Sequence, residues 1–206
     1  MTRHPQAKTG AAPSCEVDQW VLAEQGKRQR SGENVTALLI GIGAEEQALR
    51  MATAGARVLL LSDGKAPEHV NILQQPASTL SAPEMVLPLQ PFDIICCQRS
   101  LCAFPYNEAK QTIRRLLARL KIGGKLFISL YGIHSDLGDH YADGGKLVND
   151  RFAPVDAALA ERYELHGPVC LYSERNLFML LMESGGAVLR TSTSALGHVR
   201  GVAAHI

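Results

Sequence analysis

The chain has 206 residues, of which 46% are hydrophobic and 20% are charged, and its formal net charge at pH 7 is +1. This composition is typical of a globular protein of about one domain and excludes a disordered or fibrous chain. The balanced charge argues against a nucleic-acid partner, and the lack of a long apolar run argues against a membrane span or a secretory signal. The five cysteines form no CxxC pair, so we expect a cytoplasmic protein with reduced thiols and no metal site.

The first part of the chain alternates helical patterns with short apolar runs. We predict a helix over 16–30, a strand over 35–43, a helix over 44–55 and a strand over 56–62. The run VTALLIGIG at 35–43 is apolar on both faces, which is typical of a central parallel strand. Residues 1–14 precede these elements and are expected to form a flexible tail.

The same alternation continues to the end of the chain. We predict further strands at 70–73, 92–98, 125–132, 187–193 and 198–204, and helices at 107–120, 155–162 and 173–184. Asn107 and Ser173 are expected to cap two of these helices. Only SALG separates the last two strands, so they should form a hairpin. The sequence therefore predicts an α/β fold with an open, mostly parallel seven-stranded sheet, a C-terminal antiparallel β-hairpin and helices on both faces.

Two motifs carry a resemblance to a known family. PFDII at 91–95 begins an apolar strand, and LARLKIGGKLFIS at 117–129 runs from a leucine-rich helix through a Gly-Gly turn into the next strand. Together with the order of the elements, these motifs resemble the class I S-adenosylmethionine-dependent methyltransferases. The resemblance implies a Rossmann-like fold, one methyltransferase-like domain over 15–206, S-adenosylmethionine as the cofactor, and methyl transfer to a small-molecule acceptor.

The glycine loop after the first strand is a candidate ligand site. Gly41 and Gly43 let a backbone approach a ligand closely, and the helix that follows offers unpaired N–H groups. Glu45 and Glu46 in the first turn of that helix would repel a pyrophosphate, which argues against an NAD(P)-dependent reductase. The alternative is that the glycines only make a tight turn between strand and helix.

The loop departs from the pattern of the family at its acidic positions. Leu39 replaces an acidic residue, Glu45 replaces the third glycine, and Ser62 stands where the ribose-binding acid is expected, with Asp63 one step later. These departures favour a second hypothesis, a catalytically inactive methyltransferase-like module that binds a partner protein. A protein partner or a homodimer is possible on either hypothesis. On the first hypothesis, the resemblance implies cofactor contacts from Gly41, Ile42, Gly43, Ala44, Ser62, Asp63, Cys97 and Gln98.

Candidate acceptor-binding residues follow the fourth and fifth strands, because ligands of an open parallel sheet bind beyond the carboxyl ends of its strands. Arg99 follows the fourth strand and Tyr131 ends the fifth. Tyr141, Tyr172 and Arg175 are further candidates for contact with the acceptor. A surface position for Arg99 and a salt bridge on the helix surface for Arg175 remain the alternatives.

The segment 133–154 is rich in Asp and Gly and has little periodicity, which is typical of a lid or an inserted binding loop. It brings together His134, Asp136, Asp139 and His140. We predict that the segment covers the acceptor pocket, is mobile without ligand, and supplies His134 and His140 as catalytic proton acceptors. A solvated, turn-rich loop and a metal site are the alternatives.

Overall fold

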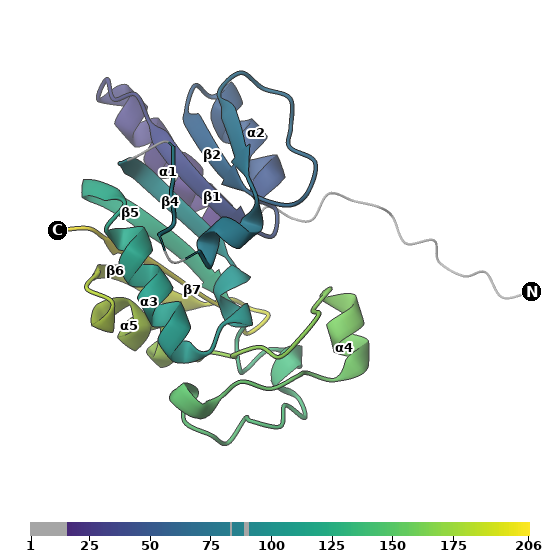
Figure 1. Ribbon diagram of the computed structural model, residues 1–206. Coiled ribbons are helices and arrows are strands. Elements are labelled where there is room, and N and C mark those ends of the chain that lie inside the picture. The colour runs from purple at the N-terminus through teal and green to yellow at the C-terminus, as the bar shows by residue number, and fades with distance from the viewer. Residues whose placement is uncertain (1–15, 83, 89–90) are drawn as a thin grey trace, which may run out of the picture.

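A single mixed sheet organises the computed structural model, which describes residues 16–82, 84–88 and 91–206 (Figure 1). Its strand order is β3-β2-β1-β4-β5-β7-β6. The strands β1 to β5 run parallel, and β7 is antiparallel to both β5 and β6. The predicted fold class is therefore confirmed, while the tail expected over 1–14 lies outside the described residues. The strands are β1 (Thr36–Gly41), β2 (Arg57–Leu61), β3 (Ile72–Gln75), β4 (Phe92–Gln98), β5 (Leu120–Leu130), β6 (Ala187–Thr193) and β7 (Val199–Ala204).

Helices cover both faces of this sheet. The α-helices are α1 (Glu16–Arg30), α2 (Ala44–Thr53), α3 (Tyr106–Leu117), α4 (Ala157–Arg162) and α5 (Glu174–Glu183). Because side chains alternate along a strand, each strand feeds two separate cores. Leu39 and Cys96 pack with α1 and α2 on one face, whereas Leu38 and Cys97 pack with α3 and α5 on the other (Figure 1). Among the described residues, no helix is both long and apolar enough to cross a bilayer.

Several element boundaries differ from the prediction, most clearly at α3 and β5. The helix α3 follows Pro105 and ends at Leu117, so Asn107 lies within its first turn instead of capping it. Leu120 belongs to β5, and the KIGG sequence at 121–124 lies inside that strand instead of ending the helix. The pairing of β5 with β4 shifts its register there, and Gly123 adopts a φ of +75°, so the glycines form an irregularity that local pattern does not distinguish from a turn.

The start of α5 follows its local sequence signal closely, whereas β3 does not. Ser173 caps α5 through a capping box: its hydroxyl accepts from the Asn176 N–H, and the Asn176 side chain accepts from the Ser173 N–H. The third strand begins at Ile72, two residues later than expected, and no helix joins it to β2. Between β3 and β4, the described residues contain one short 3₁₀ turn, at Ala77–Leu80, and no α-helix.

A buried carboxylate fixes the end of the sheet opposite the glycine loop. Asp93, in the PFDII motif, is 1% exposed and accepts hydrogen bonds from the backbone N–H and the hydroxyl of Thr36. The Lys121 ammonium lies 2.8 Å from its second oxygen, and Arg28 of α1 lies 3.4 Å from the first. Burial alone would raise the pKa of Asp93, but the hydrogen bonds from Lys121 and Thr36 hold the pKa below its ordinary value. One side chain therefore joins β4 to β1, β5 and α1.

Asp93→Asn is expected to lower the free energy of unfolding by about 2 kcal/mol at neutral pH, because it removes hydrogen bonds to a charged group. Since the folded-state pKa lies below the unfolded value, the contribution of Asp93 is present above the unfolded pKa and is lost as the pH falls through the folded-state pKa. Urea denaturation should therefore show a constant gap between wild type and variant down to about pH 4, and a narrowing gap as the pH falls further.

The exposed Asp150 provides the matched control for this measurement. Asp150→Asn should leave the unfolding free energy within about 0.5 kcal/mol of wild type. An Asp93→Asn variant as stable as Asp150→Asn would contradict the role given to the buried carboxylate.

Candidate functional site

The candidate site begins where β1 ends against β4. Gly41 pairs with Gln98, and the N–H of Ile42 donates to the Gln98 carbonyl at 3.3 Å. A Cβ at Gly41 would lie 2.0 Å from that carbonyl oxygen, and the residue has a φ of +96°. Only glycine satisfies both conditions, because the contact is with backbone and the conformation is left-handed. The chain turns at this point between two parallel strands, where the sheet reverses its direction of winding.

The helix α2 starts directly after this turn. Gly43 occupies its N-cap with a φ of +75°, and nothing lies within 4 Å of where its Cβ would be. The side chain of Ile42 is exposed, and Ala44 is buried beneath the helix. The first-turn amides of α2 therefore sit beside open space, at the end of the helix where partial positive charge accumulates.

A carboxylate from α2 reaches the end of the neighbouring strand. Glu45 lies in the first turn of α2, and its side chain accepts a hydrogen bond from the hydroxyl of Ser62, the residue that follows β2. The Ser62 hydroxyl also accepts from the N–H of Gly64 at 2.9 Å. Asp63 is turned away, since its exposed side chain accepts from the N–H of Ala77. The structure thus places Glu45, and not Asp63, beside Ser62.

The side chains of Cys97 and Gln98 point into the interior. Cys97 is fully buried in the α3–α5 core, and burial raises the pKa of its thiol to about 12. The amide nitrogen of Gln98 donates to Asp18 of α1 at 2.7 Å and to Gln47 of α2 at 3.3 Å. Cys97 and Gln98 can therefore contribute only backbone atoms to the site. The Cys97 side chain packs in the core, and the Gln98 side chain links β4 to α1 and α2.

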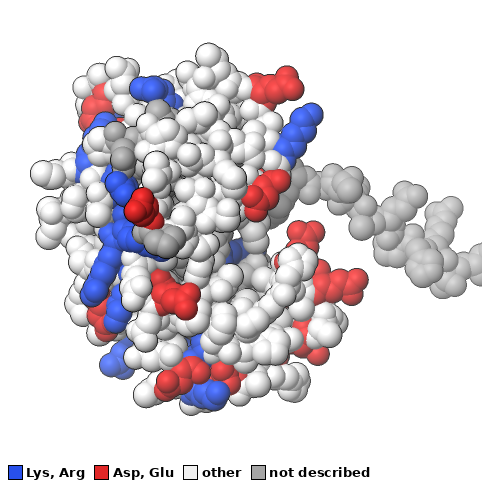
Figure 2. Space-filling view, viewed as in Figure 1, with Lys and Arg blue, Asp and Glu red and all other residues white. Residues whose placement is uncertain are grey.

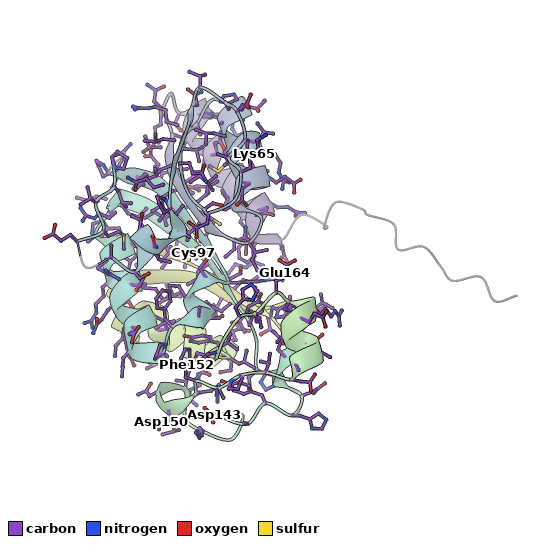
Figure 3. The ribbon with its side chains drawn as sticks, turned by 45° about the vertical axis from the view of Figure 1, so that its right-hand side comes forward. Lys65, Cys97, Asp143, Asp150, Phe152 and Glu164 are labelled. Atoms are coloured by element: carbon purple, nitrogen blue, oxygen red, sulfur yellow. The ribbon has the colours of Figure 1, made fainter. Side chains whose placement is uncertain are left out.

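A cavity of about 480 Å³ opens beyond the ends of β4 and β5. The molecular surface is hollowed between the body of the sheet and the lobe that carries α4 (Figure 2). Figure 3 labels Cys97 near the end of β4, and Phe152 and Glu164 on the long segment that follows β5. The wall of the cavity includes Ile42, Arg99, Tyr131, Phe152, Tyr163 and Val169. Ile42 links the cavity to the glycine loop.

Arg99 and Tyr131 form the floor of this cavity. The guanidinium carbon of Arg99 lies 5.2 Å from the centre of the Tyr131 ring, a cation–π arrangement. Tyr163 and His198 pack edge-on against the same ring at centroid distances of 5.7 Å. Burial raises the pKa of Tyr131, and the Arg99 cation partly offsets this rise. Burial and the Arg99 cation lower the pKa of His198, so this imidazole is neutral at neutral pH.

The segment 133–154 is tied to the body of the protein by buried polar groups. The Tyr141 hydroxyl donates to the Val169 carbonyl and accepts from the N–H of Ala153, and burial raises its pKa to about 12. The Arg151 guanidinium donates to the carbonyls of Leu171 and Lys146 at 2.7 and 2.8 Å. Of this segment, Phe152 lines the cavity. Tyr141 is not part of the cavity wall, and its hydroxyl instead links the segment to Val169.

Several predicted side chains are not brought to the cavity. His134 and His140 are exposed, and neither belongs to its wall. This placement removes the geometric basis for their role as proton acceptors, since a base must reach the acceptor. Tyr172 is buried against Tyr106, with ring centres 6.3 Å apart, and Arg175 is exposed on the first turn of α5. Within the described ranges, no cluster of three or more His, Cys, Asp or Glu side chains could hold a metal ion.

Sequence reasoning missed part of the wall. Tyr163, Glu164 and His166 come from the stretch between α4 and Tyr172, which carries no motif. The Tyr163 hydroxyl donates to Asp136 at 2.8 Å, so the stretch is anchored to the segment that precedes α4. Only the topology could have indicated these residues. The whole connection from β5 to α5 starts at the edge of the sheet where ligands bind, so any part of it could line a pocket there.

Comparison with solved structures identifies the fold. A Mesorhizobium loti S-adenosylmethionine-dependent methyltransferase aligns with a TM-score of 0.60 at 13% identity, over 88% of this chain and 97% of its own. A Burkholderia thailandensis 1,6-didemethyltoxoflavin N1-methyltransferase, solved with that compound and S-adenosylhomocysteine, aligns with a TM-score of 0.60 at 12% identity, over 98% of each chain. A complex of a Haloferax volcanii methyltransferase activator with a methyltransferase aligns with a TM-score of 0.56 at 11% identity, over 92% and 96%.

The sequence itself gives no such match. No model of a known protein family matches the chain, and no curated protein matches it. The solved structures align over most of the chain at low identity, and the fold is that of the class I S-adenosylmethionine-dependent methyltransferases. The fold implied by the resemblance is therefore confirmed.

Gly41→Ala is expected to lower the free energy of unfolding by more than about 3 kcal/mol, because a Cβ would collide with the Gln98 carbonyl oxygen as well as strain the backbone. Gly32→Ala is the matched control, since Gly32 has a φ of +82° but nothing within 4 Å of its Cβ position. That variant should lose only about 1 kcal/mol, the cost of the left-handed conformation. If thermal or urea denaturation showed the same loss of unfolding free energy for both variants, the close contact between Gly41 and β4 would contribute nothing to stability.

Proposed function

We propose that this protein transfers a methyl group from S-adenosylmethionine to a small-molecule acceptor. The observation that carries the proposal is the carboxylate of Glu45 held beside Ser62, at the end of β2 and next to the glycine loop. The methyltransferase resemblance calls for a ribose-binding acid at the position of Ser62, where the sequence has none. In the folded chain, Glu45 supplies a carboxylate at that place from a different element.

The residues around Glu45 suit the adenosine and ribose of such a cofactor. A carboxylate accepts hydrogen bonds from a vicinal diol, and burial beside Ser62 favours a fixed orientation of its oxygens. Glu45 is half-buried and within hydrogen-bonding reach of Ser62, whereas Glu46 is exposed and lies 3.4 Å from the Arg50 guanidinium. The open space at Gly43 leaves room for a ligand against the backbone.

When bound, S-adenosylmethionine would supply a methyl group on a sulfonium, open to displacement by an acceptor lone pair with S-adenosylhomocysteine as the leaving group. The contribution of the chain is to hold the acceptor in line with that methyl and to exclude water. The cavity floored by Arg99 and Tyr131 adjoins the glycine loop through Ile42, so an acceptor bound there lies next to the cofactor site. No side chain in its wall needs to act as a strong base when the acceptor is already nucleophilic.

The rival hypotheses lose support at the same position. An NAD(P)-dependent reductase would place a pyrophosphate at the N-terminus of α2, next to the carboxylates of Glu45 and Glu46. The inactive-module hypothesis rested on Leu39, Glu45 and Ser62 as lost functions. The hydrogen bond between Glu45 and Ser62 accounts for two of these three departures together. The carboxylate missing at Ser62 is replaced by that of Glu45.

Glu45→Gln is expected to weaken S-adenosylhomocysteine binding about 10- to 100-fold, because it replaces a charged acceptor of two ribose hydroxyls by a neutral one. Isothermal titration calorimetry of wild type and variant with S-adenosylhomocysteine measures this change. The amide of the variant still accepts a hydrogen bond from Ser62, so the local structure should persist.

Glu46→Gln serves as the control, since it makes the same chemical change one residue away on the exposed side of α2. Its affinity should match wild type within about 2-fold. Unchanged or tighter binding by Glu45→Gln would mean that Glu45 is not a ribose ligand. An absence of binding to wild type would remove the methyltransferase proposal.

A further inference from the structure

The cavity beyond β4 and β5 presents one recessed cation in an otherwise largely apolar wall. Its ionised side chains are Arg99 at the floor and Glu164 at the rim, and Glu164 is exposed. His198 behind the floor is neutral, because burial and Arg99 lower its pKa. The Asp136 carboxylate lies behind the wall, where it accepts from the Tyr163 hydroxyl and pairs with Arg162. Arg99 is therefore the cation in the wall that faces the cavity, while the charge of Glu164 is screened by solvent.

Arg99 is held in a left-handed backbone conformation at the turn that follows β4. It adopts a φ of +62°, which is uncommon for a residue with a side chain and costs about 1 kcal/mol or more. Backbone hydrogen bonds enforce this conformation, from the Arg99 N–H to Ser129 at 2.8 Å and from the Cys102 N–H to Arg99 at 3.1 Å. Across the described part of the chain, no carboxylate lies within ion-pair distance of its guanidinium. The strained backbone thus positions a cation that is left without an anionic partner.

A second polar group of the cavity wall has hydrogen-bonding capacity to spare. Tyr131 is 1% exposed, and its hydroxyl lies close enough to the Arg99 guanidinium for that cation to counteract the rise of its pKa, but it makes no hydrogen bond of good geometry within the described residues. Buried hydroxyls are nearly always satisfied by protein, water or ligand. The remaining walls are the faces of Phe152, Tyr163 and Val169, which accept flat or aliphatic groups.

From this arrangement we propose that the methyl acceptor is a small carboxylate with an aromatic or aliphatic body, anchored by Arg99 with Tyr131 as a second donor. The proposal rests on methyl transfer as the function and names the class of acceptor. A guanidinium binds a carboxylate through two parallel N–H···O bonds. The single charge of Arg99, with the carboxylate of Glu164 at the rim, matches the charge of a monoanion better than that of a doubly charged phosphate.

The cavity holds both the anchor and the approach to the cofactor site. Arg99 and Ile42 of the glycine loop both line it, and Arg99 follows Gln98, whose carbonyl accepts from the Ile42 N–H. On this proposal the carboxylate of the acceptor binds Arg99, and another atom of its body presents the lone pair that receives the methyl group. The volume of about 480 Å³ accommodates a molecule of this size.

The test is a binding experiment that does not require turnover. Wild type, Arg99→Gln and Arg57→Gln would each be titrated, by ligand-observed NMR or calorimetry, with benzoate, 4-hydroxybenzoate, indole-3-acetate and hexanoate and with the corresponding neutral amides. Each titration is repeated with saturating S-adenosylhomocysteine. Arg57 is the matched control, because it is an exposed arginine at the start of β2, the opposite end of the sheet. Phenyl phosphate tests the other anionic class.

Wild type and Arg57→Gln should bind at least one carboxylate about 10-fold or more tightly than its amide, and Arg99→Gln should lose that preference. S-adenosylhomocysteine affinity should stay the same in all three proteins. The proposal is overturned if no carboxylate is preferred over its amide, or if phenyl phosphate binds best. It is also overturned if Arg99→Gln instead weakens S-adenosylhomocysteine, which would make Arg99 a ligand of the cofactor carboxylate. A failure of S-adenosylhomocysteine to bind wild type, with carboxylate preference intact, would remove the methyltransferase function and leave the anion site.

Discussion

The contact between Gly41 and the carbonyl of Gln98 determines the geometry of the whole site. Because β1 and β4 meet without an intervening side chain, β1 can turn sharply over the end of β4. That turn sets the start of α2, and the start of α2 sets the direction in which Glu45 points. The same turn exposes Ile42 toward the cavity beyond β4 and β5. A single backbone contact thereby relates the proposed cofactor site to the proposed acceptor site.

The sheet divides these two sites between its two halves. The winding runs from β1 outward to β3 on one side and from β4 outward to β6 on the other, so a crevice opens where it reverses. Glu45 and Ser62 belong to the β2 side of this crevice, and Arg99 and Tyr131 belong to the β5 side. The connection from β5 to α5 covers only the second side. We propose on this basis that cofactor recognition is built into the core elements, whereas acceptor recognition depends on the long connection.

Local sequence patterns predicted the elements well, because strands buried on both faces are continuous apolar runs and helix ends have caps such as Ser173. The alternation of strands and helices predicted an open, mostly parallel sheet, and the resemblance implied its Rossmann-like class. The partnership of Glu45 with Ser62 could not be predicted, since it joins a helix turn to a strand end across 17 positions of the chain. The histidines of the segment 133–154 were chosen for their chemistry, but its path is set by buried anchors such as Tyr141 and Arg151. In the folded segment His134 and His140 are exposed, and sequence composition alone does not encode that placement.

The central claim is that a nucleoside cofactor binds between the glycine loop and the end of β2. Amide NMR of the full chain, titrated with S-adenosylhomocysteine, tests it most directly, because each backbone N–H reports on its own surroundings. The account predicts saturable shifts concentrated at residues 41–45 and 62–64, with little change at the β6–β7 hairpin. No shifts up to millimolar ligand, or shifts confined to residues away from this crevice, would contradict it.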